Sequence, residues 1–139
     1  MSEVEDFETA IQVPARFETA PDLSQIRPLL RTRRGQLSRC MLPPKTISLT
    51  QRSKTIEEIW FFLRGIGQVR RKLEDHEETV DVGPGVCLTI PTGTHFQFRN
   101  VGQEPLTFVI ATMPPWPGDD ECVRVPDHWP SEEQLEVER

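Results

Sequence analysis

Short apolar segments separated by turn-forming residues run through most of this chain and constrain its fold more than any other feature. Its 139 residues include 13 prolines and 8 glycines. Apolar runs of strand length occur at 47–52, 86–90 and 106–113, and no segment gives a convincing helical pattern. The pattern predicts an all-β domain with many turns and eight or nine strands, as in a double-sheet jelly-roll barrel.

Length, charge and cysteine spacing exclude several classes of protein. The chain fits one domain with one hydrophobic core, and its net charge of −6 argues against a nucleic-acid partner. It has no run of eighteen apolar residues, and three of its first six residues are acidic. We therefore expect no membrane partner, no secretory signal and a cytoplasmic location. Cys40, Cys87 and Cys122 have no CxxC spacing and are expected to be free thiols.

We expect three parts along the chain. Residues 1–23 form a polar N-terminal arm that is partly disordered or pairs along a sheet edge. Residues 24–113 form the barrel. Residues 114–139 form a proline-rich tail that carries Trp116 and Trp129, and these tryptophans predict that the tail packs on the barrel or on a partner subunit.

Glycines mark the expected turns within the barrel. Arg64-Gly65-Ile66-Gly67 is expected to join the strands 56–63 and 67–73 as a hairpin. Gly83-Pro84-Gly85 is expected to turn the chain into the strand 86–90.

Two short motifs carry a resemblance to a known family. The first is Glu58 followed after six residues by Gly65, in EEIWFFLRG. The second runs from Gly85 through Pro91-Thr92-Gly93 to Asn100, in GVCLTIPTGTHFQFRN. Together they resemble the two signature motifs of the cupin superfamily, and with MPPWPGDDE they are similar to small single-domain bacterial cupins. The resemblance implies a cupin double-stranded β-helix (jelly-roll) barrel with a small-molecule site inside it.

The resemblance covers about residues 26–113 but departs from the usual cupin metal site. In cupins three histidines and the glutamate bind Fe, Mn, Ni or Zn. Here Gln51, Ser53 and Phe96 stand at the histidine positions, and only Glu58 matches. Serine and phenylalanine are poor partners for these ions. We therefore expect no bound transition metal and no cofactor.

Strand alternation provides an independent prediction of which side chains point into the barrel. Gln51 and Ser53 share a strand face with the apolar residues before them, so both are expected to point inward. With Glu58 inward, as in cupins, alternation places Trp60 and Phe62 on the same face. The predicted surroundings of Glu58 are therefore largely aromatic.

The strand after Pro91 allows two registers. Counting from the proline turns Phe96 and Phe98 inward, and their apolar character favours this register. A slip of one residue or a bulge would instead bring His95 into the cavity. His95 is the only histidine near either motif, so the second register stays open.

The candidate chemistry centres on Glu58. A carboxyl desolvated among aromatic rings should have a raised pKa and exchange protons near neutrality. We expect metal-independent isomerisation, cyclisation or elimination of a small organic molecule, with Glu58 as acid or base. The residues expected to contact that molecule are Gln51, Ser53, Trp60, Phe62, Phe96 and His95.

Other interpretations stay open. Glu58 has a purely structural role if its carboxyl is satisfied by hydrogen bonds to Gln51 or Ser53. The protein could be a non-catalytic cupin that holds a small ligand, or a metal-dependent oxygenase or isomerase with an atypical ligand set. In each case fold alone does not select the chemistry.

The outward face of the Glu58 strand predicts a covering partner. Ile59, Phe61 and Leu63 alternate with the inward residues and are too apolar for open water. We expect a homodimer, with the proline-rich tail as the other candidate to cover this face.

Overall fold

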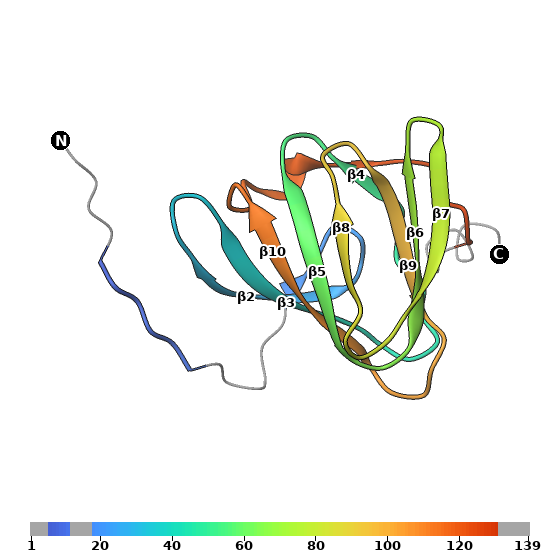
Figure 1. Ribbon diagram of the computed structural model, residues 1–139, viewed down its shortest axis with the longest axis horizontal. Coiled ribbons are helices and arrows are strands. Elements are labelled where there is room, and N and C mark those ends of the chain that lie inside the picture. The colour runs from blue at the N-terminus through green and yellow to red at the C-terminus, as the bar shows by residue number, and fades with distance from the viewer. Residues whose placement is uncertain (1–5, 12–17, 131–139) are drawn as a thin grey trace.

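The computed structural model describes residues 6–11 and 18–130, and these form two antiparallel β-sheets that face each other as a barrel (Figure 1). In sheet order, the six-stranded sheet contains β1 (Glu18–Thr19), β2 (Gln25–Arg31), β3 (Gln36–Leu42), β10 (Leu106–Met113), β5 (Glu57–Arg64) and β8 (Cys87–Ile90). The five-stranded sheet contains β11 (Cys122–Arg124), β4 (Gln51–Ser53), β9 (His95–Asn100), β6 (Gly67–Leu73) and β7 (His76–Val82). The predicted all-β jelly roll is therefore confirmed.

An aromatic cluster fills the space between the sheets. β5 and β10 bury alternate residues, as expected for strands with one face toward a core. Trp60 and Phe62 from β5 meet Phe108 from β10, with ring centroids 4.7 and 4.6 Å from the Phe108 ring. Phe98 from β9 crosses from the opposite sheet and lies 5.3 Å from Trp60. These rings join the two sheets into one core.

The predicted hairpin between the strands around residues 64–67 is wrong. β5 pairs with β10 and β8, whereas β6 pairs with β7 and β9, so this segment carries the chain from one sheet to the other. The crossing is tight: a Cβ atom at Gly67 would lie 2.3 Å from the carbonyl oxygen of Arg99. The glycine is therefore required for a close backbone crossing and not for a hairpin turn.

The tail returns to the outer face of the five-stranded sheet. The fully buried Gln97 accepts from the backbone N–H of Trp129 at 2.9 Å and donates to its carbonyl oxygen at 2.7 Å. The Arg99 guanidinium lies 4.2 Å from the Trp129 ring. Closer to the barrel rim, the carboxylate of Glu121 accepts from the backbone N–H and the hydroxyl of Thr55. The tail to residue 130 thus packs on its own barrel.

The N-terminal arm adds an edge to the six-stranded sheet. β1 pairs with β2, and the turn between them reaches the interior of the barrel. The rest of the predicted arm lies partly at residues 1–5 and 12–17, outside the described residues. No helix among the described residues is long and apolar enough to cross a membrane.

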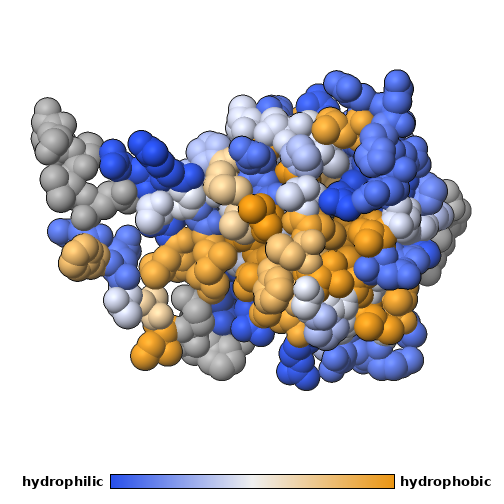
Figure 2. All heavy atoms as spheres, in the orientation of Figure 1, coloured by the Kyte–Doolittle hydropathy of each residue, from blue (hydrophilic) through white to orange (hydrophobic). Residues whose placement is uncertain are grey.

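Apolar side chains on the outer face of the six-stranded sheet are partly exposed. Ile59 and Phe61 are each 42% exposed, and Leu37 on β3 is 43% exposed. Figure 2 shows apolar side chains gathered on this face. In the same orientation, Figure 1 shows β5 and β10 there. The tail described above covers the other sheet, so a second subunit remains the expected partner of this face.

We therefore expect the protein to elute as a dimer and the double substitution Ile59→Lys with Phe61→Lys to make it a monomer. The reason is that two lysines would place desolvated charge in an apolar contact. Size-exclusion chromatography with light scattering measures this directly. Leu73→Lys, at an apolar position that is 37% exposed on another strand, is the matched control. A wild-type monomer would contradict the expectation.

Candidate functional site

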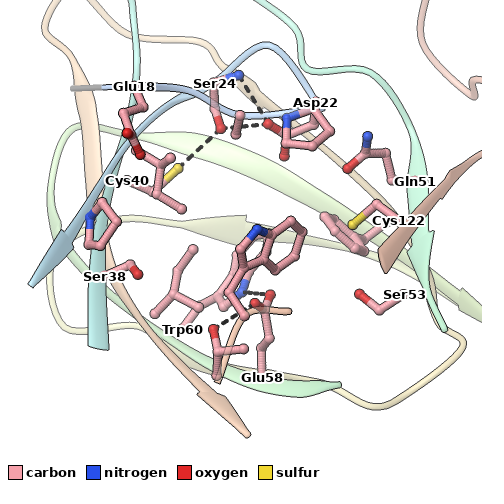
Figure 3. A pocket seen from close by; sticks show the side chains of 18 of the residues that line it. Glu18, Asp22, Ser24, Ser38, Cys40, Gln51, Ser53, Glu58, Trp60 and Cys122 are labelled. Carbon is pink, nitrogen blue, oxygen red and sulfur yellow. Dashed lines mark hydrogen bonds between the residues drawn. The ribbon is translucent and has the colours of Figure 1, made fainter. Parts of the chain in front are cut away.

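A cavity of about 390 Å³ lies between the sheets and is lined from both of them, from the β1–β2 turn and from the tail. Its volume falls in the range of small-molecule sites. Figure 3 shows Glu58 on one side of the cavity and Asp22 on the other, with Gln51, Ser53 and Cys122 along a third side. The cavity therefore gathers polar side chains from segments that are far apart in the sequence.

Glu58 enters the cavity from β5 and is held by two hydrogen bonds. The indole N–H of Trp60, two residues along the same strand face, donates to Glu58 Oε1 at 3.0 Å. The hydroxyl of Thr112, directly opposite on β10, donates to Oε2 at 2.9 Å. The bonds to Gln51 or Ser53 considered under the structural alternative do not form, and these two residues lie on β4 in the other sheet. Glu58 is thus oriented by its own sheet.

The enclosure of Glu58 raises its pKa above the ordinary value for glutamate. Desolvation is the largest cause, and the negative charges of Asp22 and Glu121 add to it. The bonds from Trp60 and Thr112 act in the opposite direction, since they stabilise the ionised carboxylate. Desolvation is the larger effect, so the pKa of Glu58 lies above that of a glutamate in water.

Asp22 is a second carboxyl at the cavity and is also desolvated. Its Oδ1 accepts from the hydroxyl of Ser24 at 2.6 Å and from the backbone N–H of Ser24 at 3.0 Å. The thiol of Cys40 in turn donates to the Ser24 hydroxyl at 3.3 Å. Burial raises the pKa of Asp22, against the lowering effect of the Ser24 bonds. Burial also raises the pKa of the Cys40 thiol well above its usual range, so this thiol stays protonated.

Four of the residues that the sequence predicted at the substrate line the cavity together with Glu58. They are Gln51, Ser53, Trp60 and Phe96. The register of β9 is the first of the two considered, because both Phe96 and Phe98 face the cavity.

Phe62 and His95 do not line the cavity, contrary to expectation. Phe62 points inward but lies deeper, fully buried against Phe108. His95 points away from the cavity, between Arg52 and Lys72 on the neighbouring strands. Partial desolvation and the positive charges of Lys72, Arg52 and Arg70 lower the pKa of His95. Its position follows from the inward register of Phe96.

Several residues that line the cavity were not predicted from the sequence. Ser38 and Cys40 on β3 and Thr112 on β10 follow the same alternation that located Gln51, and would have been found by applying it to those strands. Asp22 lies in a turn, where alternation gives no direction. No local signal in the sequence pointed to it.

The residues at the usual cupin metal position do not fit a transition metal. Gln51, Ser53 and Glu58 supply only oxygen donors, and the fourth position is the ring of Phe96, packed 5.5 Å from Trp60. Within residues 6–11 and 18–130, no three or more His, Cys, Asp or Glu side chains are grouped so that they could hold a metal ion. The donor chemistry therefore differs from that of a typical metal-binding cupin.

The fold and the position of this cavity define a small barrel protein with an internal cavity. The cupin domain family matches residues 38–112, more than half of the chain, and the chain therefore belongs to the cupin family. No curated protein shows significant similarity to it.

Solved structures of several different proteins have a fold similar to that of this chain. The cupin domain of Schizosaccharomyces pombe Cnp3 is 14% identical, with a TM-score of 0.59 over 66% of this chain and 64% of that domain. The plu4264 protein of Photorhabdus luminescens is 19% identical, with a TM-score of 0.62 over 75% of this chain and 85% of that one. The capsular polysaccharide assembling protein CapF of Staphylococcus aureus is 15% identical, with a TM-score of 0.67 over 84% of this chain but 33% of that one. At these identities the likeness shows the fold alone.

The raised pKa of Glu58 gives a testable pH dependence of stability. The unfolded chain loses the Glu58 proton at lower pH than the folded chain, so wild-type protein loses stability as pH rises above about 4.5, through the raised folded pKa. Glu58→Gln removes this titration and keeps the shape. We expect the free energy of unfolding of Glu58→Gln, relative to wild type, to increase from pH 4 to pH 7.

Denaturant unfolding at several pH values measures that difference. Glu57→Gln is the matched control, because Glu57 is exposed on the opposite face of the same strand. Its difference from wild type should change little over the same range. A Glu58→Gln difference that falls with pH would mean that the hydrogen bonds from Trp60 and Thr112 outweigh desolvation.

Proposed function

We propose that this cupin binds a small organic molecule in the barrel cavity and transfers a proton to or from it through Glu58, without a transition metal. The reaction is an isomerisation, a cyclisation or an elimination. The observation that carries the proposal is the oriented carboxyl of Glu58, with a raised pKa, on the wall of a cavity whose other polar groups do not form a metal site.

The two hydrogen bonds of Glu58 suit proton transfer. Each carboxylate oxygen accepts one bond from the protein, which leaves a lone pair on each for a substrate proton. Both donors stabilise the ionised form, whereas desolvation favours the protonated form. This balance supports a group that changes protonation during a reaction near neutral pH.

The remaining cavity residues support binding of a largely apolar molecule. Trp60, Phe96 and Phe98 provide aromatic walls, and Gln51 and Ser53 provide polar atoms on the side of the cavity between Glu58 and Asp22. A few placed polar groups among aromatic side chains are typical of small-molecule sites. In this proposal Gln51 and Ser53 orient the substrate, while Glu58 exchanges the proton.

Proton transfer can be detected before the substrate has been identified. A library of small organic compounds is incubated with the protein in D₂O, and mass spectrometry reads the incorporation of deuterium into carbon-bound positions. We expect one compound class to exchange, and Glu58→Gln to slow that exchange by roughly 10²-fold or more, as for a positioned acid or base.

Two controls separate this outcome from unfolding or an alternative mechanism. Glu57→Gln changes the neighbouring, outward carboxyl and should leave exchange intact. His95→Ala should also have little effect, because His95 does not face the cavity. If His95→Ala abolished exchange and Glu58→Gln did not, the proposed mechanism would be wrong. Binding of a compound with no exchange would favour the non-catalytic ligand-binding cupin.

The same preparation tests the metal. Protein purified without a polyhistidine tag should contain much less than one equivalent of Fe, Mn, Ni, Cu or Zn by elemental analysis. Exchange activity should survive a chelator, because Gln51, Ser53 and Phe96 replace the usual ligands. Stoichiometric metal that is lost together with activity in Glu58→Ala would support the metal-dependent alternative instead.

A further inference from the structure

All the charged residues that line the cavity within the described part of the chain are acidic. Glu18 and Asp22 approach from the N-terminal segment, Glu58 from β5, and Asp119 from the tail. No lysine, arginine or histidine from residues 6–11 or 18–130 reaches the lining. Arg52, which adjoins β9, belongs to the outward-facing row beside His95. The electrostatic potential of this cavity therefore favours positive charge and opposes anions.

The apolar part of the lining is equally suited to a cation. Trp60, Phe96, Phe98 and Phe108 form one aromatic wall, and Trp116 from the tail adds a second indole. The faces of aromatic rings, tryptophan above all, attract ammonium groups, and more strongly where water is excluded. The same rings would bind the apolar body of an organic ligand. Neither contact provides any attraction for a carboxylate or phosphate.

Gln51 adds a polar group that faces a ligand. The residue is 5% exposed and lines the cavity, and its side-chain amide makes no hydrogen bond to the described residues. Its amide atoms therefore open onto the cavity, where a ligand can satisfy them. Its carbonyl oxygen and N–H groups are available to a polar group of the ligand, for example a hydroxyl or an ammonium N–H.

We propose that the cavity binds a small organic cation, an ammonium group on an apolar body, with the ammonium between Asp22 and Glu58 and the body against the aromatic wall. This assigns a substrate class to the site and rests on the proposed function for its catalytic consequence. Bound positive charge favours ionised carboxylates. The ligand therefore converts Glu58 to the form that acts as a base.

Proton release on binding is a direct consequence. Burial raises the pKa of both Asp22 and Glu58 in the free protein, and a bound cation opposes that shift. The other titratable groups at the cavity or coupled to these two carboxyls are Glu18, Cys40, Asp119, Glu121 and Cys122. The two thiols stay protonated, because burial raises their pKa, that of Cys122 to about 12. Asp22 and Glu58 are thus the source of the released protons.

Three probes of matched shape test the charge preference: phenethylamine, which is protonated at neutral pH, uncharged 2-phenylethanol, and the anion phenylacetate. Calorimetric titration gives each Kd, and repeating the phenethylamine titration in buffers of different ionisation enthalpy gives the protons released. We expect phenethylamine to bind about tenfold or more tightly than 2-phenylethanol. Phenylacetate should not bind detectably, and phenethylamine should release protons below neutral pH.

Substitutions at the two carboxyls test whether they cause the preference for the amine over the alcohol. Asp22→Asn and Glu58→Gln should each lower the ratio of the alcohol Kd to the amine Kd several-fold. The double variant should lower it further, to the residual preference that Glu18, Asp119 and the aromatic wall provide. A ratio is insensitive to a general loss of folded protein. Asp75→Asn, at the exposed β6–β7 turn, is the matched control and should leave the ratio unchanged. No binding of the amine at millimolar concentration, tighter binding of the anion, or an unchanged ratio in the double variant would each overturn the proposal.

The binding experiment and the deuterium-exchange experiment can fail independently, so they distinguish the substrate class from the catalytic role of Glu58. Cation binding that depends on Asp22, without any deuterium exchange, would keep the substrate class and remove the catalytic role. Glu58-dependent exchange of an anionic or uncharged compound, without amine binding, would keep the proposed function and remove the substrate class.

Discussion

The hydrogen bond from the Trp60 indole to Glu58 joins the apolar core to the polar cavity. Trp60 is 1% exposed and its ring packs against Phe96, Phe98 and Phe108, so its N–H is buried among apolar groups. An unpaired buried N–H would cost about 1–3 kcal/mol. Glu58 satisfies it at 3.0 Å, two residues away on the same strand face. The largest side chain of the core thus fixes the carboxyl on which the proposed chemistry depends.

The surroundings that orient Glu58 also make it costly to ionise. Thr112 supplies the second bond, but burial and the nearby charges of Asp22 and Glu121 oppose ionisation. Asp22 repeats the pattern, with hydrogen bonds from Ser24 and a raised pKa. When they are ionised, two desolvated carboxyls at one cavity lower the free energy of unfolding of the protein. Active and binding sites commonly retain such groups at the expense of stability, and a structural core gains nothing from them.

The cavity residues that could be predicted from the sequence are those that follow from the alternation of side chains along a strand. It places Gln51, Ser53 and Trp60 at the cavity and excludes Glu57, because the side-chain period of a strand is two. It does not give depth along the barrel, so it predicts Phe62 at the ligand although this ring lies in the core. Nor does a period of two say which sheet the next strand joins, so the pattern predicts a hairpin after β5 where the chain crosses between sheets.

The parts of the cavity that sequence motifs could not predict lie outside the matched cupin domain. Asp22 and Ser24 precede residue 38, and Trp116 and Cys122 follow residue 112, yet all four line the cavity. The barrel itself supplies Glu58, Gln51 and the aromatic wall in fixed positions. The segments before and after it supply the opposite carboxyl and the second indole. Because these added segments are not part of the barrel motif, proteins that share the barrel can present different charge to a ligand. The ligand class of this cupin therefore has to be argued from the assembled cavity.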